Sequence, residues 1–210
     1  ENQVWRPLTL TAGTIAVGGA IAWGEENNDN HGEVNANAAY GFTDNLTVSI
    51  GNINYRILAR PDNKTGLELT LGLGLRGFQE TINNEDSFAY GGDLNGKYVI
   101  DENTAMIFSL GYVLWDEEKQ KNKDEFRYSV GFQTNITKNW STTTSYMYRD
   151  LNDFIQKDAH EFTVNANYAL SKNTDIGIFT TYTNFDAQQN GYKNDNNFER
   201  AAGIYAVYRF

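Results

Sequence analysis

Residues 125–137 read EFRYSVGFQTNIT, and their side chains alternate between two kinds with a period of two. The first kind is apolar and mostly aromatic: Phe126, Tyr128, Val130, Phe132 and Ile136. The second kind is polar or small: Arg127, Ser129, Gly131, Gln133 and Asn135. Successive side chains of a β-strand point to opposite faces, so this stretch predicts a strand between an apolar and a polar environment.

The same alternation recurs along the chain, for example in residues 66–79, 88–100 and 160–170. Two kinds of connection take turns between these runs. One kind is short, as in residues 101–103, 138–139 and 171–173. The other is longer and polar, as in residues 81–87, 116–124, 150–158 and 186–197. This rhythm predicts an antiparallel meander with tight turns at one end and exposed loops at the other.

The composition sets limits on the class of protein. The chain has 210 residues, which favours a single domain over residues 1–210. It has no cysteine, so disulfides, thiolate nucleophiles and Cys-ligated metals are excluded. The net charge of −10 and the 17 dispersed Lys and Arg argue against nucleic acid as a partner. Residues 7–24 are uncharged and long enough for a transmembrane helix, but their Gly and Thr content favours strands.

The apolar face is expected to point outward. Most of the predicted strands have ten to thirteen residues, whereas strands of soluble sheets usually have about five or six. A tilted strand of about 9–11 residues crosses a bilayer. Aromatics make up 14% of the chain, and Trp23, Trp115 and Trp140 lie close to predicted strand ends, as in an interfacial girdle. The pattern therefore favours a membrane barrel with a polar lumen over a soluble sandwich or a lipocalin-like barrel.

The C-terminal run supports this interpretation. Residues 198–210 read FERAAGIYAVYRF, and one face carries Phe198, Ala202, Ile204, Ala206, Tyr208 and Phe210. The segment GIYAVYRF with its terminal Phe resembles the closing strand of Gram-negative outer-membrane β-barrels. The resemblance implies a transmembrane antiparallel up-and-down barrel in the cell outer membrane, with the barrel assembly machinery recognising this strand. The architecture is similar to that of small monomeric porins, although no subfamily motif is present.

Twelve strands satisfy the even parity of bacterial barrels. They are expected at residues 3–12, 14–24, 33–42, 46–59, 67–79, 88–100, 104–115, 125–137, 140–150, 159–170, 174–185 and 198–210. A change of phase within 46–59 predicts a bulge at residues 51–52. With this count, residues 25–30 fall on the periplasmic side. The alternative has ten strands, with the N-terminal segment tucked into the lumen.

If the apolar face meets lipid, the alternate residues face the lumen. The charged residues assigned to it are Arg56, Glu68, Arg76, Asp93, Lys97, Arg127, Arg149, Glu161, Asp175, Glu199 and Arg209. These side chains either line a channel for small hydrophilic or charged solutes or pair with one another and fill the interior. Small inward residues such as Gly72, Gly131 and Gly203 favour an open lumen.

Other functions rest on fewer residues. His160 lies near Asp150, Asp153, Asp158 and Glu161, an acid–histidine grouping that an outer-membrane enzyme could use. Glu25, Glu26 and Asp29 near His31 form an unspecific candidate for a divalent cation. We expect no enzymatic activity, no metal site and no cofactor. A closed structural or adhesion barrel, whose loops bind an external partner, is the main alternative to a channel.

The expected partners follow from the barrel interpretation. They are outer-membrane lipid and lipopolysaccharide, the assembly machinery and small polar solutes, and the chain is expected to be a monomer. It begins Glu1-Asn2-Gln3, with no basic start and no apolar stretch after it. We therefore expect a mature chain without a signal peptide.

Overall fold

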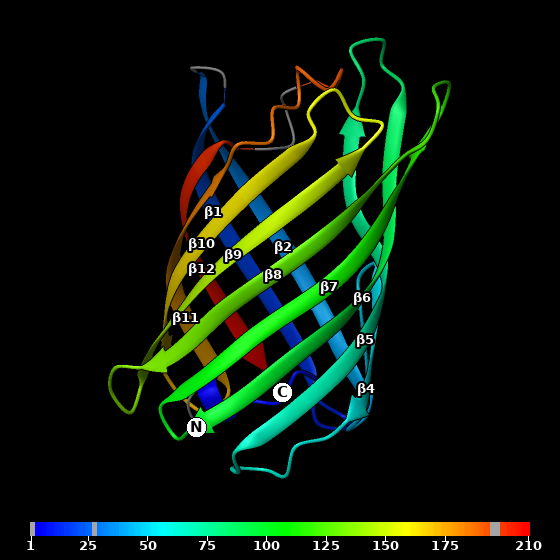
Figure 1. The fold of residues 1–210 in the computed structure, drawn as a ribbon. Coiled ribbons are helices and arrows are strands. Elements are labelled where there is room, and N and C mark those ends of the chain that lie inside the picture. The colour runs from blue at the N-terminus through cyan, green and yellow to red at the C-terminus, as the bar shows by residue number, and fades with distance from the viewer. Residues whose placement is uncertain (1–2, 27–28, 194–197) are drawn as a thin grey trace.

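The computed structural model describes residues 3–26, 29–193 and 198–210. Its strands form one closed antiparallel barrel in which each strand pairs with its sequence neighbours and β1 pairs with β12 (Figure 1). The strands are β1 (Ile15–Glu26), β2 (Asp29–Thr43), β3 (Leu46–Ser49), β4 (Asn52–Leu58), β5 (Gly66–Glu80), β6 (Asp86–Asp101), β7 (Thr104–Glu117), β8 (Lys123–Asn135), β9 (Trp140–Asn152), β10 (Asp158–Ala169), β11 (Thr174–Thr183) and β12 (Arg200–Arg209). The predicted twelve-stranded all-β barrel is confirmed.

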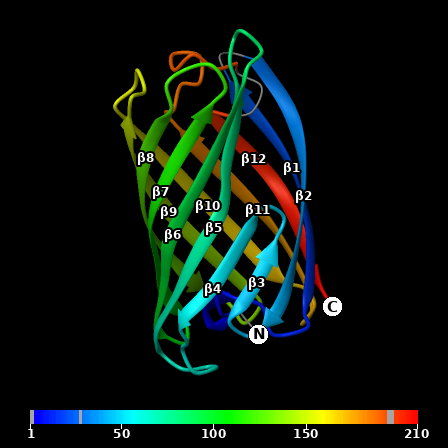
Figure 2. The same cartoon turned by 90° about the vertical axis from the view of Figure 1, so that its right-hand side faces the viewer.

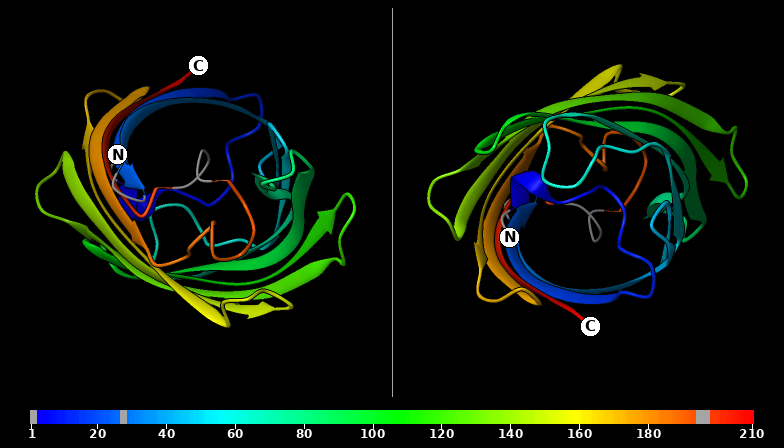
Figure 3. Two further views of the ribbon diagram at one scale, coloured as in Figure 1. Left: turned by 90° about the horizontal axis from the view of Figure 1, so that it is seen from above. Right: turned by 90° about the horizontal axis from the view of Figure 1, so that it is seen from below.

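The N-terminal residues are not a strand. The predicted strand at residues 3–12 is wrong: a 3₁₀ turn, η1 (Gln3–Trp5), is followed by irregular chain that lies inside the ring of strands (Figure 3). The alternative that placed this segment in the lumen describes it correctly. This segment lies next to polar side chains of the lumen and not next to the edge of a strand. Its backbone groups therefore form hydrogen bonds with side chains.

The missing strand comes from residues 46–58. The predicted bulge at 51–52 is wrong, because the chain reverses there and forms the hairpin of β3 and β4 (Figure 2). Ser49 pairs with Asn52, and Gly51 adopts a φ of +78° in the two-residue turn between them. Glycine accepts this left-handed conformation without steric cost. The change of phase in the sequence therefore marks a reversal of direction.

The apolar face points outward, as predicted. Leu71, Leu73 and Leu75 on β5 are 48%, 67% and 50% exposed, and Phe126 and Phe132 on β8 are 45% and 50% exposed. In water, each such side chain would forgo about 1.5–3 kcal/mol of burial free energy, so this surface suits hydrocarbon. Among the described residues, no helix has the length and apolar character needed to cross a membrane.

Both termini lie at one end of the barrel, together with the turns β6–β7, β8–β9 and β10–β11 (Figures 1 and 2). We call this the turn end. The connections β5–β6, β7–β8, β9–β10 and β11–β12 lie at the opposite loop end, as the alternation of connections predicted. The connection between β4 and β5, residues 59–65, is also long but lies at the turn end (Figure 2). Residues 194–197 of the last connection lie outside the described residues.

The expected position of residues 25–30 is wrong. Glu25 pairs with Arg200 at the start of β12, so this stretch lies at the loop end, and residues 27–28 of it lie outside the described residues. Because residues 3–12 do not form a strand, β1 is the first strand of the barrel and runs from the turn end to the loop end. The β1–β2 connection therefore lies at the loop end. The expected girdle position of Trp115 is also wrong, because this side chain is 3% exposed and points inward. Trp23 and Trp140 are 66% and 44% exposed, as a girdle requires.

Candidate functional site: the lumen

The strand register determines which side chains enter the lumen. Residues directly paired across two strands share a face, so the inward set can be followed from strand to strand around the barrel. Asp93 on β6 pairs with Gly111 on β7, which pairs with Arg127 on β8, which pairs with Arg149 on β9. All the charged residues expected in the lumen lie on inward positions of strands, except Glu199, which lies immediately before β12.

The charged residues are gathered into paired groups rather than spread as free charges. Asp175 lies between Arg6 and Arg209, accepting a hydrogen bond of 2.8 Å from Arg6 Nη2 and one of 3.0 Å from Arg209 Nη1. Glu68 is 0% exposed and accepts a 3.1 Å bond from Arg56 Nη1. Buried charges are tolerated when they are paired in this way. Cations and anions are thus largely balanced inside the barrel.

The N-terminal segment is bound inside the turn end by side chains from several strands. Lys97 Nζ donates to the carbonyl oxygens of Gln3 and Arg6, both at 2.9 Å. Arg60 Nη2 donates to the Trp5 carbonyl at 3.0 Å. The predicted lumenal residue Lys97 therefore holds a backbone segment inside the barrel.

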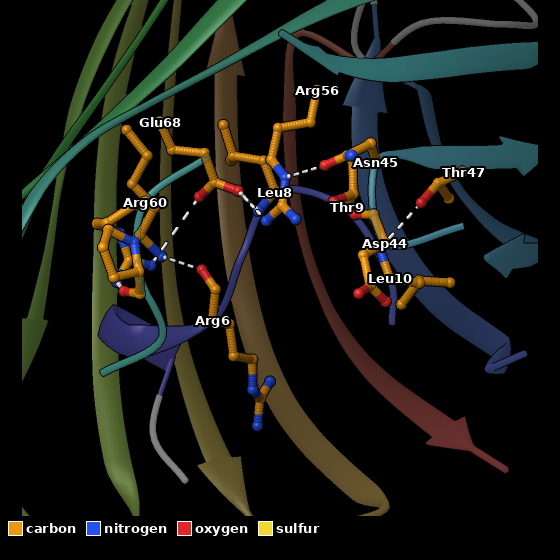
Figure 4. A network of polar contacts seen from close by, with 12 residues as sticks. Arg6, Leu8, Thr9, Leu10, Asp44, Asn45, Thr47, Arg56, Arg60 and Glu68 are labelled. Atoms are coloured by element: carbon orange, nitrogen blue, oxygen red, sulfur yellow. Dashed lines mark hydrogen bonds and ion pairs between the residues drawn. The ribbon is translucent and has the colours of Figure 1, made fainter. Parts of the chain in front are cut away.

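The next residues of the segment continue across the lumen (Figure 4). The Leu8 amide donates to Glu68 Oε2 at 3.0 Å, and the Leu10 amide donates to Thr47 Oγ1 at 2.9 Å. Thr9 Oγ1 donates to the Asp44 carbonyl at 2.6 Å. These bonds satisfy the polar backbone of an irregular segment inside the barrel. The segment consequently narrows the lumen at the turn end.

A second group of charges centres on Glu125, which is 1% exposed. Arg149 donates to both oxygens of its carboxylate at 2.8 Å, Arg127 Nε donates at 2.5 Å, and Trp115 Nε1 donates at 2.9 Å. A bidentate arginine with further donors is the strong form of a charge-assisted pair. Glu161 lies 3.9 Å from Arg149 at the edge of this group.

Residues 185–192 of the β11–β12 connection fold inward at the loop end (Figure 3). Phe185 and Tyr192 from this connection are 3% and 1% exposed, and the Arg149 guanidinium lies 4.3 Å from the centre of the Phe185 ring. The Tyr192 hydroxyl donates to Glu117 and accepts a 2.9 Å bond from Lys123. Burial, and then the hydrogen bond to Glu117, raise the pKa of Tyr192, so its hydroxyl keeps its proton.

A polar cavity of about 410 Å³ lies in the lumen beside the N-terminal segment. Leu8 of the N-terminal segment forms part of its wall, together with Arg76 and Asp93. Arg76 Nε donates to Asp93 Oδ2 at 3.1 Å, and Arg76 Nη1 donates to Asn52 at 2.9 Å. The remaining lining residues are Asn54, Thr70, Asn95, Gly96, Ile107, Phe108, Ser109, Ser129 and Gln133.

The wall formed by β1 and β2 differs from the charged side of the lumen. Asn35 and Asn37 occupy inward positions, paired with Ala20 and Gly18, and yet both are exposed. Small neighbours leave their amides in contact with solvent. We call this part of the lumen, lined by Gly18, Ala20, Asn35 and Asn37, the asparagine strip.

The candidate enzymatic group around His160 is divided by the strand alternation. His160 faces outward among tyrosines, with Tyr146 Oη 2.5 Å from its Nδ1, while Glu161 faces the lumen beside Arg149. The nearest carboxylate that pairs with His160 is Asp158, at 4.0 Å. The described residues therefore place His160 in an aromatic belt, without the close carboxylate that would orient a catalytic base.

The candidate divalent-cation residues are divided in the same way. Glu25 is exposed on the outer face, whereas Glu26 is buried and paired in register with Asp29 on the inner face. His31 lies 3.9 Å from Glu33 and packs against the Phe198 ring. Within the described ranges, no group of three or more His, Asp or Glu side chains is arranged to hold a metal ion.

Sequence reasoning missed several residues that organise the lumen. Glu125 and Lys123 continue the inward alternation of Arg127 by one and two steps, and this period alone could have found them. Arg6 was hidden by the strand predicted at residues 3–12, and Tyr192 lies in a connection without any periodicity. Long-range partners of this kind leave no local signal.

Comparison with known proteins supports the fold. No protein-family model matches the sequence, and no curated protein matches it. The NanC porin structure matches with a TM-score of 0.57 at 12% identity, covering 92% of this chain and 98% of that one. An anion-selective porin from Comamonas acidovorans matches at 0.53 and 11%, covering 94% and 98%. The KdgM porin matches at 0.52 and 9%, covering 94% and 99%. At these identities the similarity shows the fold alone, which is that of outer-membrane porin barrels.

Proposed function

We propose that this protein is a narrow channel of the Gram-negative outer membrane, through which small hydrophilic solutes diffuse. The asparagine strip is the observation that carries the proposal. It places exposed amide side chains, Asn35 and Asn37, on the inside of a barrel whose outer face is apolar. A wet polar surface enclosed by a lipid-facing sheet is the arrangement that a diffusion channel requires.

In this proposal the charged residues line the path as neutral ion pairs and leave few unpaired charges in it. Arg76, Arg127 and Arg149 each pair with a carboxylate, so little net charge faces the open part of the lumen. The N-terminal segment and the β11–β12 connection reduce the cross-section. We therefore propose small solutes and weak selectivity between anions and cations, because selection by sign needs a ring of unpaired charge.

The proposed setting follows from the same features. The exposed apolar band would contact outer-membrane lipid and lipopolysaccharide, and residues 198–210 would be read by the barrel assembly machinery. The twelve strands close on themselves without an edge from a second chain, and we propose a monomer. The proposal gives His160 no catalytic role, in keeping with its place on the outer face.

Ion conductance across a planar bilayer tests the proposal. The purified full chain should produce discrete, small current steps in neutral potassium chloride, and a salt gradient should give a reversal potential close to zero. A bilayer that holds the folded barrel and yet shows no steps would contradict the channel. A large reversal potential would contradict the balanced lumen.

A closed barrel whose loops bind an external partner is the second candidate. The two inward segments favour it, since Val4 and Tyr192 are almost completely buried at opposite ends of the lumen. In this case the asparagine strip would be a blind cavity. The same bilayer experiment separates the two candidates, because only the channel conducts.

A further inference from the structure

The N-terminal segment, residues 3–12, is joined to β1 by a tight turn with open space on one side. The Thr14 amide donates to the Thr11 carbonyl at 3.0 Å, and Gly13 adopts a φ of +82°. Apart from its chain neighbours, no atom lies within 4 Å of the position where Gly13 would carry a Cβ. Residues 11–13 are exposed. This turn can therefore change its backbone angles without displacing packed side chains, as a hinge requires.

Little apolar surface holds the segment inside the barrel. Val4 is 0% exposed and packs with Val99 and Ala105 of the wall. The other apolar side chains of residues 5–12 are only partly buried or are exposed. The remaining attachment consists of hydrogen bonds with polar side chains of the lumen. Water can replace such polar partners, whereas it cannot replace a packed apolar contact.

Three side chains that hold the segment are themselves incompletely bonded. Glu68 Oε2 accepts from the Leu8 amide, while its Oε1 has no hydrogen bond and lies 3.9 Å from Arg60 Nη2. Asn54 Nδ2 donates to the Leu8 carbonyl at 3.4 Å, while its Oδ1 has no partner among the described residues. Arg60 Nη2 donates to the Trp5 carbonyl, while its Nε has no hydrogen bond. Each of these buried atoms makes the docked state less favourable.

We propose that the N-terminal segment is a reversible plug, which leaves the turn end of the lumen by rotation at residues 11–13 and then docks again. The inference rests on the proposed channel, because the plug controls the width of that path. Release breaks the bonds to the segment, and it lets water reach the unpaired atoms of Asn54, Arg60 and Glu68. These opposing effects keep the docked and released states in exchange.

A disulfide between the segment and the wall tests the plug in planar bilayers. Leu10→Cys/Thr47→Cys joins two residues in direct contact, and the chain has no other cysteine. With reductant, single channels should switch between a low and a high conductance. Oxidation should abolish the high level, and fresh reductant should restore it. One unchanging level under both conditions would overturn the plug and leave the channel standing.

Thiol modification detects release without any current. Val4→Cys and Ala89→Cys each place one thiol at a position that is 0% exposed, Val4 in the segment and Ala89 in the buried cluster of the loop end. A water-soluble thiol reagent should modify Val4→Cys at least tenfold faster than Ala89→Cys in the folded barrel in micelles, because only Val4 leaves with the segment. Equal rates, or no modification of either thiol, would overturn the plug.

A substitution in the wall then tests which bonds hold the plug. Lys97 donates to the Gln3 and Arg6 carbonyls, so Lys97→Met should speed the modification of Val4→Cys about tenfold. The matched control is Lys123→Met, since Lys123 is also buried but contacts Glu117 and Tyr192. It should leave the rate at Val4→Cys unchanged. Equal acceleration by both substitutions would contradict a plug held by Lys97. The shift in mobility of unboiled protein on a gel shows that each variant is folded.

These outcomes separate the plug from the channel. Fast modification of Val4→Cys in a barrel that gives no current supports release of the segment and contradicts the channel alone. Current steps together with equal modification of Val4→Cys and Ala89→Cys leave the channel standing and overturn the plug.

Discussion

At the scale of single residues, Glu125 is the acidic side chain on which a buried group of charges depends. It neutralises Arg127 and Arg149 and accepts the indole bond of Trp115. Removing one partner of a buried ion pair leaves the other charge uncompensated, at a cost of about 3–5 kcal/mol. Glu125→Gln should therefore lower the free energy of unfolding by about that amount, measured by urea titration of tryptophan fluorescence in micelles.

The matched control is Glu102→Gln, since Glu102 is exposed in the β6–β7 turn at the opposite end of the barrel. It should change the free energy of unfolding by less than about 0.5 kcal/mol, as surface substitutions usually do. Equal effects of the two substitutions would mean that the carboxylate of Glu125 is not a buried counter-charge.

The sequence predicts which face of the barrel a side chain lies on much better than it predicts which residues that side chain contacts. Period-two alternation assigned Arg76, Asp93 and Lys97 to the inner face, because a strand has no other way to place successive side chains. It could not predict that Lys97 binds backbone carbonyls of residues 3 and 6, since that contact joins segments more than ninety positions apart. Trp115 was misplaced because its aromatic ring near a strand end was given more weight than its phase, since Leu110, Tyr112 and Leu114 on the outer face put Trp115 on the inner face.

At the scale of elements, the N-terminal segment is the part on which sequence and structure differ most. Residues 3–12 are apolar enough to read as a strand, but their backbone bonds go to lumenal side chains such as Glu68 and Thr47. The β3–β4 hairpin supplies the missing strand, because Gly51 allows a reversal inside a run that looks continuous. The even strand number was thus predicted correctly, while two of its elements were not.

Cross-linking tests the position of this segment. The chain contains no cysteine, so the double substitution Leu10→Cys/Thr47→Cys introduces the only thiols. The Leu10 amide nitrogen donates to Thr47 Oγ1 at 2.9 Å, so the two residues are in direct contact. Oxidation of the folded barrel should form an intramolecular disulfide, detected as a loss of two mass units in mass spectrometry.

Leu10→Cys/Thr163→Cys is the control for the cross-link. Thr163 also faces the lumen, but it lies on β10, well removed from β3 around the barrel. This pair should remain reduced under the same conditions. If both pairs oxidise equally, or if neither does, the segment does not occupy the position described.

At the scale of the whole molecule, the account depends on which side of the sheet meets water. Leu73 is 67% exposed on the outer face, and Asn37 is exposed on the inner face within the asparagine strip. In a soluble barrel the apolar face of the sheet would point inward and be buried, and the polar face would point outward into solvent. In the present barrel the polar side is enclosed and the apolar side is free to contact lipid.

The most direct measurement is the reaction of single cysteines with a water-soluble, membrane-impermeant thiol reagent after reconstitution into lipid bilayers. We predict that Asn37→Cys reacts rapidly, since it lies on the solvent-exposed strip inside the barrel. Leu73→Cys should stay unmodified until a denaturant unfolds the barrel. Rapid reaction of Leu73→Cys together with protection of Asn37→Cys in intact bilayers would contradict the account.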